Sequence, residues 1–179
     1  MPTVSVSSKK TRKNKTIMSR WRPPAPRSTP VITPEGYAAL EREVKELWAK
    51  RRIVNDALAA AAAEGDRSEN AEYIYRKKEQ AGIDRRIRYL QKRMPDLKLV
   101  DKVGDTSKVY FSAYVELERN DGAIVKYRIV GADETNTQAG DISVDSPLAK
   151  ALMKKGIDDE VFIKMGEKTV SYVILDINY

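Results

Sequence analysis

Two carboxylates, Asp66 and Glu69, stand three positions apart in the segment 65–73, which reads Gly-Asp-Arg-Ser-Glu-Asn-Ala-Glu-Tyr. A carboxylate pair can help to bind magnesium, which usually combines one or two protein carboxylates with water and phosphate oxygens. The chain has no histidine and no cysteine, which excludes an imidazole base, a thiolate nucleophile and a thiolate zinc site. Because two acids alone cannot complete an octahedral shell, we interpret the pair as part of a two-metal phosphodiester-cleaving site that a partner completes.

The same two residues also have a structural interpretation. Asp-x-x-Glu at the start of a helix has the spacing of a capping box, in which each side chain accepts a backbone amide of the other residue. Negative charge near a helix N-terminus is also favoured by the helix dipole. The two interpretations are compatible, because a cap would hold both carboxylates in place, and the spacing alone does not separate them.

The acid pair falls between two segments with helical periodicity. Thr33 as N-cap and Pro34 at the first helical position predict a helix start. Steps of three and four residues then trace a coiled-coil seam in each segment. The first seam is Tyr37, Leu40, Val44, Leu47, Arg51, Val54, Leu58 and Ala61; the second is Tyr73, Arg76, Gln80, Ile83, Ile87, Leu90 and Met94, before Pro95. A short connection predicts an antiparallel hairpin roughly 40 Å long, with Asp66 and Glu69 at its tip.

Several basic residues lie along this hairpin. A solvated coiled-coil face and a stripe that contacts nucleic-acid phosphates are both compatible with them. Two of them occupy seam positions, where charge is costly, which favours the second interpretation for these positions. The candidates for backbone contact with RNA are Arg51, Arg52, Arg76, Lys77 and Lys78.

After Pro95 the pattern changes to short alternating segments. Strands are predicted over 109–118, 123–130, 141–144, 161–164 and 169–177, with the turn Asn-Asp-Gly at 120–122 joining the first two. Ser146 and Pro147 predict the cap of a short helix that runs to about residue 155. The fold class is therefore α+β: an N-terminal antiparallel helical hairpin followed by a small antiparallel sheet with one short helix.

The net charge of +7 is concentrated at the N-terminus. Residues 1–30 contain eight Lys or Arg and no acid, so the rest of the chain sums to −1. We expect 1–30 to be a disordered basic extension, either a solubilising tail or a DNA contact, with a transit peptide as a weaker alternative. The hairpin is assigned to 31–95, with its acidic tip at 65–70, and a C-terminal domain to 96–179. No segment has the roughly 20 apolar residues of a membrane span, and we expect a cytoplasmic monomer.

Three motifs resemble those of Gre-type bacterial transcript cleavage factors, and the GreB branch more than the GreA branch. The first is Thr-Pro-Glu-Gly-Tyr at 33–37, the second is the tip segment 65–73 followed by Lys77 and Lys78, and the third is Ile-Ser-Val-Asp-Ser-Pro-Leu-Ala at 142–149. The Arg-rich stretch 83–90 also resembles GreB. The resemblance covers residues 31–179, and the basic extension is not part of the usual family pattern.

The resemblance implies an accessory factor with no activity of its own. Its hairpin would enter the secondary channel of a backtracked RNA polymerase and stimulate cleavage of the 3′ end of the nascent RNA. Asp66 and Glu69 would hold a magnesium ion shared with the polymerase, and no cofactor would bind stably to the chain alone. The resemblance assigns tip support to Arg67, Ser68, Asn70 and Tyr73, and docking to Asp145, Ser146 and Pro147 in an FKBP-like C-terminal domain.

Two alternatives remain. Gre-like proteins that block the channel and inhibit the polymerase share the fold but carry altered tips, whereas this chain keeps both acids. A coiled-coil DNA-binding module driven by the basic extension is the other alternative. The test is the effect of Asp66→Asn combined with Glu69→Gln on cleavage of the extruded RNA in stalled, backtracked complexes. Undiminished cleavage would show that the cleavage-factor interpretation is wrong.

Overall fold

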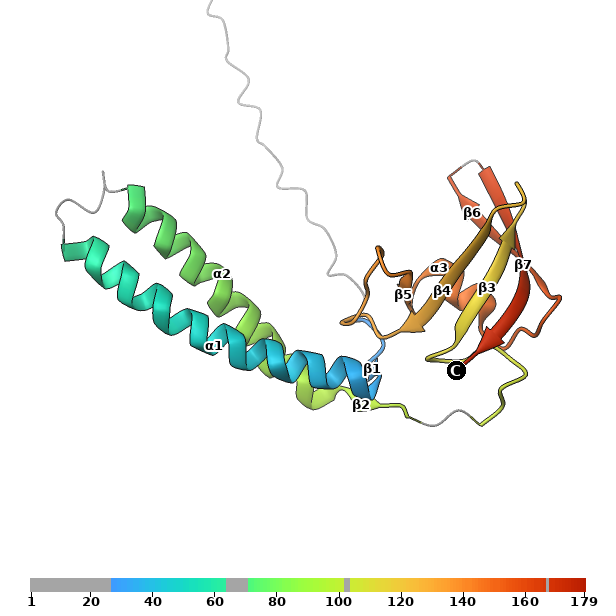
Figure 1. Cartoon of the computed structure of the whole chain (residues 1–179), viewed down its shortest axis with the longest axis horizontal. Coiled ribbons are helices and arrows are strands. Elements are labelled where there is room, and N and C mark those ends of the chain that lie inside the picture. Colours follow the sequence, from blue (N-terminus) through green and yellow to red (C-terminus); the bar gives the residue numbers. More distant parts are fainter. Residues whose placement is uncertain (1–26, 64–70, 102–103, 167) are drawn as a thin grey trace, which may run out of the picture.

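The structure is a computed structural model that describes residues 27–63, 71–101, 104–166 and 168–179. Two long helices, α1 (Pro34–Ala63) and α2 (Ala71–Arg93), form an antiparallel hairpin that projects from a small sheet domain (Figure 1). At 1.5 Å per residue, α1 is about 45 Å long and α2 about 35 Å. Helix α1 begins and α2 ends beside the sheet, so the joined ends at Ala63 and Ala71 lie far from it (Figure 1).

Both predicted seams are found at the contact between the two helices. Every seam residue from Tyr37 to Ala61 and from Tyr73 to Met94 is buried or half-buried. The apolar contacts form two clusters. One, at the base, contains Ile32, Leu40, Leu90 and Leu97, and the other, farther out, contains Val54, Ile83 and Ile87.

The two ends of the hairpin are joined at the base by a pair of short strands. Strand β1 (Val31–Ile32) precedes α1, and β2 (Lys98–Leu99) follows the 3-10 turn η1 (Met94–Asp96) that ends α2. The two strands pair in parallel, an arrangement that the sequence did not predict. As a result, the chain entering the hairpin and the chain leaving it are hydrogen-bonded to each other.

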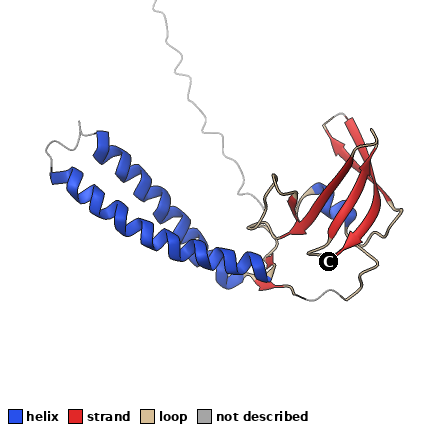
Figure 2. Ribbon diagram, in the orientation of Figure 1, coloured by secondary structure: helices blue, strands red, loops and turns tan. Residues whose placement is uncertain are grey.

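The C-terminal domain is a five-stranded sheet with one short helix (Figure 2). The strands lie in the order β5-β4-β3-β7-β6. Their bounds are Tyr114–Arg119 for β3, Ile124–Val130 for β4, Asp141–Ser143 for β5, Glu160–Met165 for β6 and Lys168–Asn178 for β7; helix α3 is Pro147–Leu152. The predicted α+β class is confirmed, although within the sheet β5 pairs in parallel with β4.

Two element boundaries differ from the sequence prediction. The strand predicted over 109–118 begins only at Tyr114, because the chain turns at residues 111–112, where Ser112 has a φ of +71°. The helix predicted to run to about residue 155 ends at Leu152, since Lys154 has a φ of +67° and residues 154 and 155 exchange backbone hydrogen bonds with Val109. Both errors come from one long-range contact between the segments 108–113 and 153–156.

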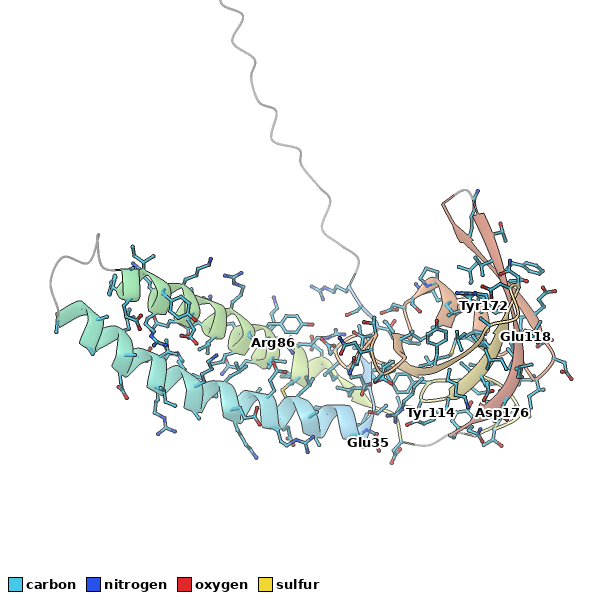
Figure 3. All side chains as sticks on the ribbon, turned by 45° about the horizontal axis from the view of Figure 1, so that its top comes forward. Glu35, Arg86, Tyr114, Glu118, Tyr172 and Asp176 are labelled. Atoms are coloured by element: carbon cyan, nitrogen blue, oxygen red, sulfur yellow. The ribbon has the colours of Figure 1, made fainter. Side chains whose placement is uncertain are left out.

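One face of the sheet carries the domain core and the other is open. Alternate residues of the strands, with Val109 from the segment before β3, pack with Ala149 and Leu152 of α3. Val109, Leu117, Ile129 and Ile174 are fully buried. The open face is polar. It carries Tyr114, Glu118 and Asp176, labelled in Figure 3, and an ion pair of 2.7 Å between Lys126 and Glu116. Among the described residues, no helix is long and apolar enough to cross a membrane.

Candidate functional site

The five tip residues Asp66, Arg67, Ser68, Glu69 and Asn70 lie outside the described residues. The structure nevertheless defines the ends that they join. Helix α1 is described to Ala63 and α2 from Ala71, and these two ends lie side by side at the end of the hairpin remote from the sheet (Figure 1). The seven residues between them, 64–70, therefore connect the two helices at that end.

The outer half of the hairpin has little apolar bulk. Beyond the cluster around Val54, the contact between helices includes a 2.6 Å hydrogen bond from the Gln80 amide to the Asn55 side chain. Helix α1 then ends in a run of five alanines, 59–63, of which Ala61 is buried. Alanine maintains the helix without filling space between helices. This half of the hairpin is consequently a narrow rod.

Tyr73 is the one predicted tip-support residue that the structure describes. It lies in the first turn of α2 and is half-buried, and the Lys77 ammonium group lies 5.8 Å from the centre of its ring. Tyr75, by contrast, is 60% exposed, with the Arg76 guanidinium 5.5 Å from its ring. The more buried of these two rings is thus the one nearer the connection between the helices.

The five residues predicted to contact RNA fall into two groups. Arg51 and Arg76, the two on seam positions, form ion pairs within the hairpin: Arg51 with Asp84 at 2.5 Å, and Arg76 with Glu72 and Glu79 at 2.7 and 3.2 Å. These ion pairs explain why two arginines can occupy half-buried positions between the helices. The remaining three, Arg52, Lys77 and Lys78, are exposed, and no ion pair joins them to another described residue.

Further cations follow Lys78 along the outer surface of α2. Arg85, Arg88 and Lys92 are exposed and, with Lys78, recur at steps of seven, three and four residues. This spacing places the four on one face of the helix over about 21 Å. Arg86, labelled in Figure 3, instead forms a two-pronged pair with Glu43 at 2.6 and 2.8 Å. Those hydrogen bonds lower the pKa of the Glu43 carboxyl.

The predicted docking residues lie at the start of α3. Ser146 is the N-cap, and its hydroxyl accepts the amide of Ala149 at 3.1 Å. Pro147 is exposed in the first turn. The Asp145 carboxylate accepts two hydrogen bonds from Thr29, from its hydroxyl at 2.6 Å and its amide at 2.7 Å, which lower the pKa of Asp145.

Two acids at the junction of the hairpin and the sheet domain were not predicted from the sequence. Asp133 and Glu134 lie in the loop between β4 and β5 and bind residues of the hairpin base. An adjacent acid pair in a loop has no distinctive spacing, and the partners of these two lie 40 and 101 positions away in the sequence. Within the described residues, no group of three or more acids could hold a metal ion.

Comparison with known proteins identifies the family. The family described as "Transcription elongation factor, N-terminal" matches residues 30–99, and "Transcription elongation factor, GreA/GreB, C-term" matches residues 104–179. The transcription elongation factor GreB of Xanthomonas axonopodis pv. citri is 54% identical over 165 residues, 90% of this chain and 98% of the relative. GreB of Pseudomonas aeruginosa is 49% identical over 164 residues, with the same coverage.

Solved structures of related factors are more distant. The structure of GreA factor homolog 1 from Thermus thermophilus aligns with 20% identity and a TM-score of 0.39, covering 83% of this chain and 98% of that one. The GreA/GreB factor of Nitrosomonas europaea aligns with 17% identity and a TM-score of 0.39, covering 84% and 100%. On its two family matches and its close relatives, the chain belongs to the GreA/GreB family of transcription elongation factors.

Proposed function

We propose that this elongation factor inserts its hairpin into the secondary channel of a backtracked RNA polymerase and stimulates cleavage of the RNA 3′ end. It does so as an accessory factor, not as an enzyme in its own right. The single observation that supports this most strongly is the position of the acid-bearing connection. Residues 64–70 join the far ends of a helical rod about 45 Å long, remote from the only other domain of the described chain.

The chemistry of the tip follows from its two carboxylates. Asp66 and Glu69 offer the hard oxygen ligands that magnesium prefers, and they are too few to bind the ion tightly alone. We therefore assign them part of a magnesium shell whose other ligands belong to the polymerase. Such an ion would supply charge neutralisation and an activated water for attack on the phosphodiester.

The outward cations on the hairpin supply the contact with RNA in this proposal. Arg52, Lys77 and Lys78 are exposed and lack acidic partners in the described chain, so their charges can meet phosphates. Arg51 and Arg76 would act less directly, since each already pairs with an acid of the hairpin. The start of α3, with Asp145, Ser146 and Pro147, would dock on the rim of the channel.

The basic N-terminal extension has a role in this proposal that is independent of RNA cleavage. Residues 1–30 carry eight Lys or Arg without an acid, and we propose that they add a salt-sensitive contact with nearby DNA. The hairpin and sheet domain do not depend on this contact for the cleavage function.

The test uses RNA polymerase stalled on a template and backtracked, with the RNA labelled at its 5′ end. Addition of the wild-type factor should shorten the RNA, whereas Asp66→Asn with Glu69→Gln should not. The matched control is Glu46→Gln with Asp56→Asn, which removes two exposed acids from α1 and leaves the tip intact. A factor that slows elongation without shortening the RNA would instead be a channel-blocking inhibitor. Undiminished cleavage with the tip variant would refute the role of the two acids.

A further inference from the structure

We propose that Asp133 and Glu134 form an interdomain clamp that sets the direction of the hairpin relative to the sheet domain. They would be positioning residues for the tip, without contact to RNA or metal. This inference rests on the proposed function, since it explains how a factor docked through one domain aims the other. Both residues lie in the loop between β4 and β5, which lies next to the base of the hairpin (Figure 1).

Glu134 holds the start of α1. Its Oε1 accepts the backbone amides of Thr33 at 3.0 Å and Gly131 at 2.8 Å, and its Oε2 accepts the Thr33 hydroxyl at 2.6 Å. The Thr33 hydroxyl in turn accepts the amide of Gly36 at 3.0 Å as the helix cap. Thr33 is only 1% exposed. One carboxylate thus links the cap of α1 to the sheet domain, at a helix end where negative charge is favoured.

Two glycines pack closely around Glu134. A Cβ placed on Gly36 would lie 1.8 Å from Glu134 Oε2 and 2.6 Å from its Cδ. A Cβ on Gly131 would lie 2.2 Å from the carbonyl oxygen of Val31. The sheet domain therefore meets the hairpin backbone to backbone at Gly131, and at Gly36 the helix backbone packs directly on the Glu134 side chain.

Asp133 holds the other helix. One of its oxygens accepts the Arg93 Nε–H at 2.8 Å, and the other accepts the Tyr89 hydroxyl. The side chains of Asp133 and Arg93 are only 5% and 14% exposed, so removal of either charge leaves its partner buried and unpaired. Arg93 also donates to the Ser28 hydroxyl at 2.8 Å, which ties in the segment leading to α1.

Neighbouring residues of one loop therefore bind the N-cap residue of α1 and the last turns of α2. A single contact would leave the hairpin free to pivot, whereas contacts with both helices fix its direction. Smaller contacts add to the junction: Arg128 lies 3.3 Å from Glu35, and Thr29 binds Asp145. Glu35 and Tyr114, labelled in Figure 3, mark the two sides of this junction.

The length of the arm makes the direction important. For a rod of about 45 Å, a tilt of about 10° at the base moves the far end by about 8 Å. Displacements of about 1 Å in a catalytic group can reduce rates about 100-fold. Loss of the clamp should therefore impair delivery of the tip much more than docking of the sheet domain.

The first test measures the direction in the free, full-length protein. Because the chain has no cysteine, Asp56→Cys in α1 and Glu118→Cys in β3 provide two exposed positions for spin labels. Pulsed electron paramagnetic resonance should give one narrow distance distribution for this labelled reference. Asp133→Ala with Glu134→Ala should broaden it. The control Glu160→Ala with Asp176→Ala removes two exposed acids of the same domain and should leave the distribution narrow.

The second test separates delivery from docking in the cleavage assay. The clamp variant should cleave about tenfold or more slowly at saturating factor, with its half-saturating concentration changed by no more than about threefold. Glu134→Gln keeps an acceptor oxygen for the two amides and should restore most of the rate lost in Glu134→Ala. Should the double variant fail to fold, Gly36→Ala displaces the same carboxylate, with Gly82→Ala as its control.

Each outcome decides a different point. A clamp variant with the reference distance distribution overturns the clamp, whatever its activity. A broadened distribution with an unchanged cleavage rate overturns the positioning role. If the wild-type factor does not stimulate cleavage, the proposed function fails while the distance measurement still decides whether the clamp exists.

Discussion

Replacing Gly36 by alanine should destabilise this protein, although the same replacement at Gly82 should stabilise it. Both glycines lie inside hairpin helices without a positive φ, where alanine is ordinarily the better residue by about 0.5–1 kcal/mol. The difference lies in what a methyl group would meet. At Gly82 there is no atom within 4 Å, whereas at Gly36 the new Cβ would lie 1.8 Å from Glu134 Oε2.

The size of the effect follows from the hydrogen bonds that Glu134 must abandon. To make room for the methyl group, the carboxylate must move, and it then gives up the hydrogen bonds that it accepts from the Thr33 amide and hydroxyl. Hydrogen bonds to a charged group contribute about 1.5–3 kcal/mol each, and a buried amide left without a partner costs about 1–3 kcal/mol. After the gain in helix propensity, we expect Gly36→Ala to lose about 2–4 kcal/mol of unfolding free energy.

Urea denaturation followed by circular dichroism at 222 nm measures both variants under identical conditions. The two should differ by about 3–5 kcal/mol in opposite directions from the wild type. A triple comparison with Glu134→Ala is also informative, since Gly36→Ala should cost little once the carboxylate is absent. If Gly36→Ala is as stable as Gly82→Ala, the close packing of Glu134 on the helix cap is refuted.

Three further predictions address the hydrophobic core, the contact between Thr29 and Asp145, and the basic extension. Leu90→Ala, at a fully buried position, should lose about 2–5 kcal/mol of unfolding free energy. Ile53→Ala, at a position that is 70% exposed, should change it by less than about 0.5 kcal/mol. Equal losses in urea denaturation would contradict the described helix contact. Because hydrogen bonds from Thr29 lower the pKa of Asp145 in the folded protein, their stabilisation is present above the unfolded value of about 3.9 and is lost as the pH falls through the folded pKa. The melting temperatures of the wild type and Asp145→Asn should therefore differ at pH 7 and converge as the pH falls below about 3.9, and a constant difference would rule out this linkage. Deleting residues 1–26 should weaken DNA binding and flatten its dependence on salt in a filter-binding assay, while unchanged binding would remove the extension from the account.

The hairpin was predictable because its determinants are local. The caps at Thr33 and Ser146, the heptad seams and the stop at Pro95 each depend on residues within a few turns of one another. The structure places each of these features where the residue types and the periodicity predicted it. The turn at Asn-Asp-Gly is local in the same sense, with Gly122 at a φ of +81°.

What the sequence did not reveal depends on contacts between distant segments. The strand predicted from residue 109 starts at Tyr114 because Val109 instead bonds with Lys154 and Lys155. The parallel pair of β1 and β2 joins residues more than 60 positions apart. Likewise, the role of Asp133 and Glu134 depends on partners at the ends of the two helices. The sequence of their own loop does not predict these partners.

The candidate site likewise has features that the sequence predicted and contacts that only the structure shows. The acid pair, the exposed cations and the docking segment were visible from residue types and from a family resemblance. The structure adds that Arg51 and Arg76 are committed to ion pairs inside the hairpin and that Asp145 already binds Thr29.

The most direct test of the central claim is the dependence of RNA cleavage on magnesium concentration in backtracked polymerase. If Asp66 and Glu69 complete the shell of a shared ion, the wild-type factor should lower the magnesium concentration needed for half-maximal cleavage, relative to polymerase alone. Asp66→Asn with Glu69→Gln should abolish that shift, and Glu46→Gln with Asp56→Asn should keep it. Stimulation of cleavage by the wild-type factor with an unaltered magnesium dependence would contradict the claim.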